Sequence, residues 1–282
     1  MNEMTVPTTA ASADASRPTP NGGIGGLVAL QAATELRSTG RSLEFLIGAV
    51  AIPALLFAMI GLPMADQQLP GGTSVGAMLL VAWAGYGIVS LAIFTFGEYV
   101  AHDRSSGWMR TMRTTPLPAW GYLVSKLVVG VLCAVTIVAS TGVLAATAGG
   151  VTGSTGEWVR FVIVMLFGLL TLSTLGFAIA FLARPRAAAA TANLLFLPLS
   201  FLSGFFVPLR ELPTFVQDLA GFLPTHHLGQ LAWRQFAPVS DVEYWIGGPA
   251  AGVATNVAWL LGSCVVFALL ARWGAGREAA NR

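Results

Sequence analysis

The chain has 282 residues, of which 55% are hydrophobic and only 10% are charged, and its formal net charge is +2. Soluble globular domains carry about 25% charged residues, so this composition predicts a protein that is surrounded mostly by lipid. The small net charge gives no reason to expect a nucleic-acid partner. No metal-ligand pattern stands out either, because Cys133 and Cys264 both lie in apolar runs, as small hydrophobic residues do.

The N-terminal region has two parts. Residues 1–23 are rich in Ser, Thr, Ala and Pro, a composition typical of a disordered tail. Beyond them, Ala29, Ala32, Ala33 and Leu36 recur at helical spacing and would share one face, with Gln31, Thr34, Glu35 and Ser38 on the opposite face. This pattern predicts a helix over residues 24–42 that lies in the membrane interface. A simple juxtamembrane linker is the alternative.

Membrane spans are the main feature of the remaining sequence. About 20 apolar residues cross the hydrocarbon core as a helix, because lipid satisfies no backbone N–H or C=O group. Six stretches qualify, at about residues 45–62, 75–97, 122–148, 158–183, 189–207 and 252–271. The predicted fold is therefore an all-α membrane protein, with six transmembrane helices in one domain over residues 24–282.

The basic residues predict the orientation of these spans. With the N-terminus inside, all of the 15 Lys and Arg residues lie on the inner side except Arg160, Arg210 and Arg234. An excess of Lys and Arg marks the cytoplasmic side, so both termini are expected there. The single lysine, Lys126, falls near the start of the third span. Its side chain can snorkel to the interface there, and a role in gating or coupling is the alternative.

The largest predicted cytoplasmic loop lies between the second and third spans. On a helix, Trp108, Met109 and Met112 would form one apolar patch beside Arg110 and Arg113. Such a short cationic amphipathic helix is suited to the groove of a soluble partner. An ordinary positively charged loop, which only anchors the topology, is the alternative.

A second unusual segment is the predicted outer region over residues 208–249. It is apolar at helical spacing after Pro213 and again after Pro224, yet both pieces are too short to span a membrane. We expect short helices that dip into the outer interface or cap the bundle. The adjacent His226 and His227 are expected to be polar residues of that interface, because no partner beside them suggests an intramembrane enzyme or a metal site.

Two groups of residues resemble a known family. The loop carries Asp103-Arg104, Gly107, a basic stretch from Arg110 to Arg113, and Thr115-Pro116-Leu117. The outer segment carries Ser203-Gly204-Phe205-Phe206-Val207-Pro208-Leu209, Glu211-Leu212-Pro213 and Leu223-Pro224-Thr225-His226-His227. In this order, within a six-span layout, they resemble ABC-2 type permeases over nearly the whole chain after the tail. Asp103 stands where that family often has Glu, and the His pair replaces a more typical aromatic or polar pair.

The resemblance implies a specific biological role. Members of the family are transmembrane subunits of ATP-driven exporters in the cytoplasmic (inner) membrane of prokaryotes. They pair as dimers with a second permease protomer and bind ABC ATPase subunits. The loop would be the coupling helix seated on the ATPase, the N-terminal interfacial helix the connecting helix, and the outer segment a re-entrant helical hairpin. The implied coupling residues are Asp103, Arg104, Gly107, Trp108, Met109, Arg110, Met112, Arg113, Thr115 and Pro116.

The energy source is expected to lie outside this chain. The sequence contains no GxxxxGK[ST] motif, so we expect no enzymatic activity and no bound cofactor, with ATP and Mg²⁺ held by a separate ATPase. The alternative is an ion-coupled secondary transporter or channel. Such carriers usually hold ionisable residues deep in the membrane, and the predicted mid-span positions here hold essentially none.

The cargo is predicted only in outline. An apolar wall from the second and fifth spans would face it, with Phe94, Phe96, Phe201, Phe205 and Phe206 as candidates. For each of these residues, simple packing or contact with lipid is the alternative. A wall so poor in charge favours a hydrophobic or amphipathic substrate, such as a drug, an antibiotic (multidrug-type export) or a lipid-linked metabolite.

Overall fold

The computed structural model describes residues 24–41, 46–107 and 119–280, and every regular element in these ranges is a helix. The predicted all-α class is therefore confirmed. In the described residues, four helices are long and apolar enough to cross a membrane, namely Val75–Ser105, Trp120–Thr147, Thr155–Leu182 and Val253–Arg277. They correspond to the predicted second, third, fourth and sixth spans. The predicted tail over residues 1–23 lies outside the described residues.

The helices follow one another in a simple order. The first half contains α1 (Ile24–Arg41), η1 (Leu46–Ala51), α3 (Ile52–Leu56), η2 (Phe57–Gly61), α4 (Leu62–Met64), α5 (Val75–Ile93), η3 (Phe94–Tyr99), α6 (Val100–Ser105) and α8 (Ala119–Thr147). The second half contains α9 (Thr155–Leu182), η4 (Pro185–Ala187), α10 (Ala188–Leu202), η5 (Leu209–Glu211), α11 (Thr214–Ala220), α12 (Pro224–Trp233), α13 (Val239–Ile246) and α14 (Val253–Ala280).

The predicted spans and the observed helices differ in three places. The predicted first span corresponds to a helical run from Leu46 to Met64 that contains two π-helical stretches, and Ile52–Met64 within it is an apolar helix too short to count among the four. The predicted fifth span corresponds to α10, which has 15 residues with Pro198 inside it and is not among the four long helices. The second helix continues to Ser105 rather than ending at residue 97, because its polar last turns keep helical backbone hydrogen bonding beyond the apolar part.

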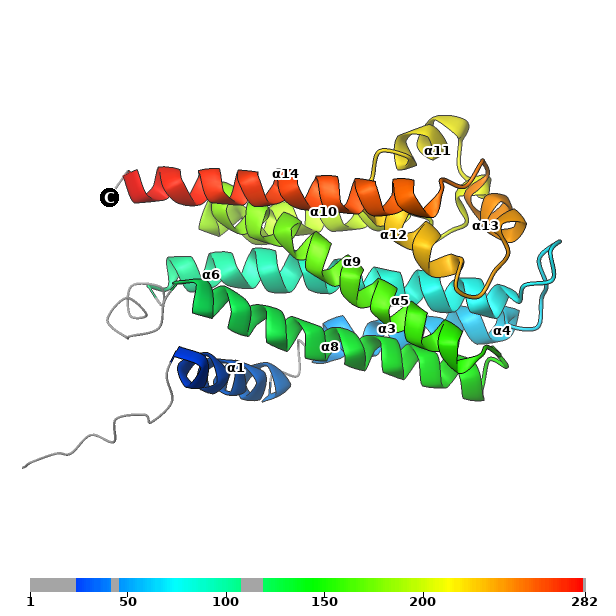
Figure 1. Cartoon of the computed structure of the whole chain (residues 1–282), viewed down its shortest axis with the longest axis horizontal. Coiled ribbons are helices and arrows are strands. Elements are labelled where there is room, and N and C mark those ends of the chain that lie inside the picture. Colours follow the sequence, from blue (N-terminus) through cyan, green and yellow to red (C-terminus); the bar gives the residue numbers. More distant parts are fainter. Residues whose placement is uncertain (1–23, 42–45, 108–118, 281–282) are drawn as a thin grey trace, which may run out of the picture.

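The short helices and connecting segments lie at the two opposite ends of the helix bundle (Figure 1). At one end lie α1, α6 and the C-terminal part of α14, and we call this the inner end. At the opposite, outer end lie α11, α12, α13 and the connection between α4 and α5. This grouping is the one that the predicted topology requires. The two His residues belong to α12 at this outer end, and both are buried within the chain, His226 to 5% exposure and His227 to 3%.

The core is built around α5, whose side chains are almost all buried. A helix that is apolar on every face belongs inside a bundle, and α5 contacts α8, α9, α10 and α12. At its inner end, a Cβ added to Gly176 of α9 would collide with the carbonyl oxygen of Ala92. Glycine at this crossing lets two backbones touch, as small residues do between membrane helices. In contrast, α14 lies at the edge of the bundle and exposes most of its apolar side chains.

Candidate coupling site at the inner end

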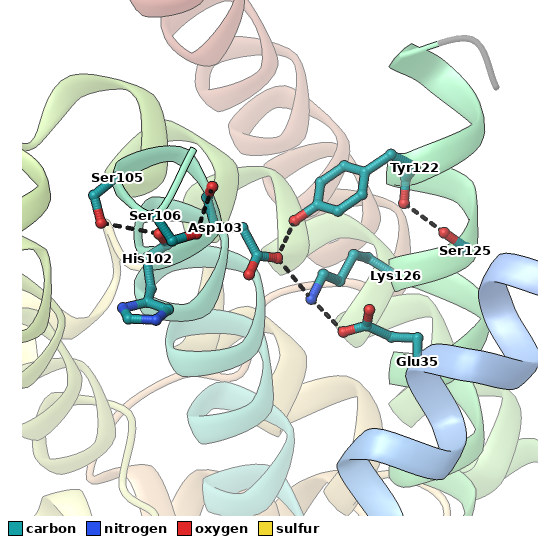
Figure 2. A network of polar contacts seen from close by, with 8 residues as sticks. All are labelled: Glu35, His102, Asp103, Ser105, Ser106, Tyr122, Ser125 and Lys126. Carbon is teal, nitrogen blue, oxygen red and sulfur yellow. Dashed lines mark hydrogen bonds and ion pairs between the residues drawn. The ribbon is translucent and has the colours of Figure 1, made fainter. Parts of the chain in front are cut away.

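An ion-paired cluster joins three helices at the inner end (Figure 2). The Nζ atom of Lys126 on α8 pairs with the carboxylate of Glu35 on α1 and lies 3.1 Å from Oδ2 of Asp103 on α6. Tyr122 on α8 donates its hydroxyl to the same Asp103 oxygen at 2.5 Å. We call Glu35, Asp103, Tyr122 and Lys126 the inner cluster.

The local sequence explains this geometry. Tyr122 and Lys126 are four residues apart on α8, so their side chains lie on one face, one turn apart. The Lys126 ammonium also lies 5.6 Å from the centroid of the Tyr122 ring, within reach of a cation–π contact. Asp103 lies in the last turns of the long second helix, and α1 packs along α8. The cluster therefore fixes α1, α6 and α8 to one another through side chains alone.

The cluster contains one cation between two carboxylates. The Lys126 side chain is 6% exposed, whereas those of Glu35 and Asp103 are 20% and 23% exposed. Removing an ammonium group from water costs several kcal/mol unless it is paired, so Lys126 needs these two partners. The Lys126 side chain reaches these two carboxylates, and its snorkelling to the interface stays a prediction. Within the described ranges, no group of His, Cys, Asp and Glu could hold a metal ion.

The inner cluster joins the two helices that flank residues 108–118. Asp103 of α6 precedes these residues and Tyr122 of α8 follows them, so α6 and α8 are fastened to each other and to α1. Ser105 and Ser106 donate their hydroxyls to the carbonyl oxygens of His102 and Asp103, at 2.9 and 3.1 Å, and so satisfy acceptors at the end of α6 (Figure 2).

The ten predicted coupling residues divide into two groups. Asp103, Arg104 and Gly107 are described: Arg104 lies 5.0 Å above the ring of Phe181, and Gly107 adopts φ +80°, the left-handed conformation that commonly follows a helix C-terminus. The others lie outside the described residues, so the amphipathic helix stays a prediction; they are Trp108, Met109, Arg110, Met112, Arg113, Thr115 and Pro116.

The five phenylalanines predicted to face the cargo do not share one environment. Phe96 and Phe205 are completely buried and pack helices together, Phe96 against Gly130 and Phe205 against Gly85. In this conformation they are core residues rather than parts of an accessible wall. Phe94, Phe201 and Phe206 are partly exposed and lie between α5 and α10.

These three residues belong to a continuous row of rings. Phe94 lies 5.2 Å from Phe196, Phe196 lies 5.0 Å from Tyr86, and Tyr86 lies 5.2 Å from Phe206. Phe206 then stacks on Phe201 at 4.4 Å. We call these five residues the aromatic row. Tyr86 and Phe196 were missed from sequence because nothing in one sequence shows which faces of α5 and α10 meet.

The chain resembles known transport proteins. The family model described as "ABC-2 family transporter protein" matches residues 60–273. YvfS of Bacillus subtilis (strain 168), a protein named as a transport permease, is 25% identical over 204 residues, which cover 72% of this chain and 83% of YvfS. The family match contains Asp103, Tyr122 and Lys126 of the inner cluster but not Glu35.

Proposed function

This chain belongs to the ABC-2 family of transporter proteins, and from that premise we propose that it is the permease subunit of an ATP-driven exporter. In this proposal a separate ABC ATPase binds ATP and Mg²⁺ and supplies the energy. The substrate is hydrophobic or amphipathic, and a second permease protomer, identical or different, completes the pathway across the cytoplasmic membrane. The apolar helices and the absence of a phosphate-binding motif in the sequence support this proposal.

The observation that carries the mechanism is the position of the inner cluster. A partner that moves residues 108–118 pushes on α6, which continues without a break into α5. The same movement is transmitted to α8, because Lys126 and Tyr122 of α8 bind Asp103 of α6. Since α5 is buried among α8, α9, α10 and α12, its displacement reaches most of the bundle. The cluster thus acts as a joint between the ATPase and the membrane helices.

The same cluster suggests a role for α1. Glu35 shares the Lys126 ammonium with Asp103, so α1 is fastened to the joint rather than floating beside it. An interfacial helix held in this way resists rotation at the membrane surface. It therefore provides a fixed point against which α6 and α8 turn.

Co-purification with an ATPase tests the proposal. We expect the tagged chain, extracted in mild detergent, to retain a stoichiometric P-loop ATPase with vanadate-sensitive hydrolysis. Trp108→Ala combined with Arg110→Glu should abolish this association. Lys126→Met should retain the association with the ATPase but uncouple hydrolysis from transport. Asp218→Asn, at an exposed residue, is the neutral control. A chain that purifies without any ATPase, even after crosslinking, would contradict the proposal.

One observation favours the alternative of an ion-coupled carrier. Lys126 and its two carboxylate partners are ionisable groups gathered inside the chain, as ion-coupled carriers often have. However, the cluster lies at the inner end of α8 and not midway along it, where such carriers usually place their ionisable groups. Transport that collapses with a protonophore and persists without ATP would support this alternative.

A further inference from the structure

A pocket of about 320 Å³ lies between the first helical run, the α5–η3 helix and α10. Its aromatic lining consists of Tyr86, Phe94, Tyr99 and Phe196, three of which belong to the aromatic row. Tyr99 is 40% exposed, so the pocket reaches the surface of the chain. The volume lies at the lower end of the range for small-molecule sites, about 300–1,000 Å³. We call this the inner pocket.

One acidic side chain, Glu98, also lines the inner pocket. It is partly buried, and no Lys, Arg or His in the described part of the chain forms an ion pair with it. In contrast, the carboxylate of Asp103, in the following helix α6, is paired with Lys126. The Glu98 carboxylate is therefore a negative charge in the pocket with which the cation of a ligand can pair.

Neighbouring polar side chains also line the pocket. Thr95 is one of them, and among the described residues its buried hydroxyl has no hydrogen-bond partner. The amide nitrogen of Asn193 donates to the Ala189 carbonyl at 2.9 Å. Asn193 also lines the pocket, and its amide oxygen is an acceptor. Oxygen acceptors and aromatic faces together form the surroundings that an organic cation prefers.

The backbone supports this arrangement. Phe94, Thr95 and Glu98 all belong to η3, a π-helical stretch within an otherwise α-helical rod. Such stretches add residues to a turn and often mark functional sites. Here the stretch turns three different kinds of side chain, aromatic, hydroxyl and carboxylate, toward one pocket.

We propose that the inner pocket is a binding site for amphipathic organic cations, and that Glu98 selects them by charge. Resting on the proposed exporter function, this assigns a substrate class to the permease. A cation in the pocket places its charge beside Glu98 and its apolar body against Phe94 and Phe196. The aromatic row continues from there toward Phe206, and offers successive π faces along α5 and α10. The apolar wall predicted from the second and fifth spans thus has one negative charge beside it, that of Glu98.

Equilibrium binding to the purified chain tests this inference without any ATPase. The probe is tetraphenylphosphonium, with the anion tetraphenylborate and neutral triphenylphosphine oxide for comparison. We expect saturable binding of the cation only, and Glu98→Gln should weaken it about tenfold or more, because it removes the charge but keeps the shape. Asp218→Asn, an exposed carboxylate change at the outer end, should leave the affinity unchanged.

A second variant guards against a simple loss of folding. Asn193→Asp adds a carboxylate to the same pocket and should tighten cation binding, a gain that misfolding cannot produce. Equal affinity of the wild-type chain and Glu98→Gln, equal binding of the borate anion, or no cation binding at all would each overturn the proposal. These results are independent of ATPase co-purification, so a failure of the binding site is distinguishable from a failure of the proposed function.

Discussion

The two ends of the bundle are held together by different chemistry. The inner cluster joins helices through one ammonium and two partly exposed carboxylates. The outer cap, which we define as α11, α12 and α13, is held mostly by neutral groups and backbone, and charged side chains contribute at Asp241 and, just after α12, at Arg234. Trp233 donates to the Met78 carbonyl at 3.0 Å, and the Gln230 side-chain oxygen accepts the Ala251 N–H at 2.8 Å. All ten residues of α12 are buried.

This difference indicates which end is built to move. Ion pairs with solvent-accessible carboxylates can exchange a partner for water at modest cost, and salt screens them. Buried hydrogen bonds between neutral groups are directional, and breaking one leaves a polar atom unsatisfied. The inner end therefore suits a joint with two arrangements, whereas the outer cap suits a rigid fulcrum. The following predictions test this contrast, from the largest expected effect to the smallest.

The largest loss of stability is expected from Trp233→Ala in the outer cap. The Trp233 ring is fully buried, lies 5.9 Å from Phe205 and 6.2 Å from Trp245, and fills the space beside Gly229. Removing a large buried ring typically costs about 3–5 kcal/mol. The thermal midpoint of the purified chain in detergent measures this loss, which should not change with salt. Trp120→Ala, at an exposed tryptophan, should cost far less.

A smaller but salt-dependent loss is expected from Lys126→Met. This change leaves the Glu35 and Asp103 carboxylates facing each other without a cation, at a cost of about 2 kcal/mol. Raising salt to about 0.5 M should narrow the gap between variant and wild type, because screening weakens the wild-type pairs and the carboxylate repulsion. Lys126→Arg is the matched control that retains the charge. A gap of the same size at all salt concentrations would refute the ionic description of the inner end.

Acid should weaken the outer cap through His226. The Gln230 amide nitrogen lies 2.7 Å from His226 Nε2 and donates to it, since the Gln230 oxygen is occupied by Ala251, so His226 Nε2 carries no proton. Burial, and then the neighbouring charge of His227, lower the pKa of His226 to about 4, from an ordinary value of 6.5. Between these values the unfolded chain binds a proton that the folded chain does not. Stability therefore falls as the pH drops from 6.5 toward 4, by about 1–2 kcal/mol at pH 5.

His226→Gln should flatten this pH dependence, because the substituted side chain does not titrate. His102→Gln, at an exposed histidine of α6, should leave it unchanged. The measurement is the thermal midpoint of each variant across this pH range. An unaltered slope in His226→Gln would show that other groups cause the acid sensitivity.

The helices themselves were largely predictable from sequence. The third, fourth and sixth spans begin within a few residues of α8, α9 and α14, because a long apolar run in lipid has no alternative to a helix. The short outer helices α11 and α12 were also expected after Pro213 and Pro224. Missed was the extension of the second helix through Ser105, where polar residues gave no apolar signal to follow. Also missed was α13, although Val239, Val242 and Ile246 recur there at helical spacing.

The side-chain partners were not predictable, for a physical reason. Glu35 was correctly expected on the polar face of a helix, but its pairing with Lys126 depends on how α1 and α8 face each other across 91 residues. Burial of the His pair likewise depends on the packing of α12 against α14. A single sequence shows which face of a helix is polar, and does not show what that face meets. The inner cluster and the inner pocket both form where the faces of different helices pack against one another.

The smallest effect is expected from Asp241→Asn, where the outer cap does use a charge. The two carboxylate oxygens of Asp241 accept the backbone N–H groups of Gly71 and Thr73, at 2.6 and 3.0 Å, and so fasten the connection before α5 to α13. An Asn amide keeps one acceptor and turns a donor toward the other N–H, a loss of about 1 kcal/mol. Local hydrogen exchange at residues 69–74 should rise severalfold, while exchange in α6 and α8 stays unchanged. If α6 also loosened, the two ends would be mechanically coupled through α5, and the outer cap would be part of the moving machinery rather than its fulcrum.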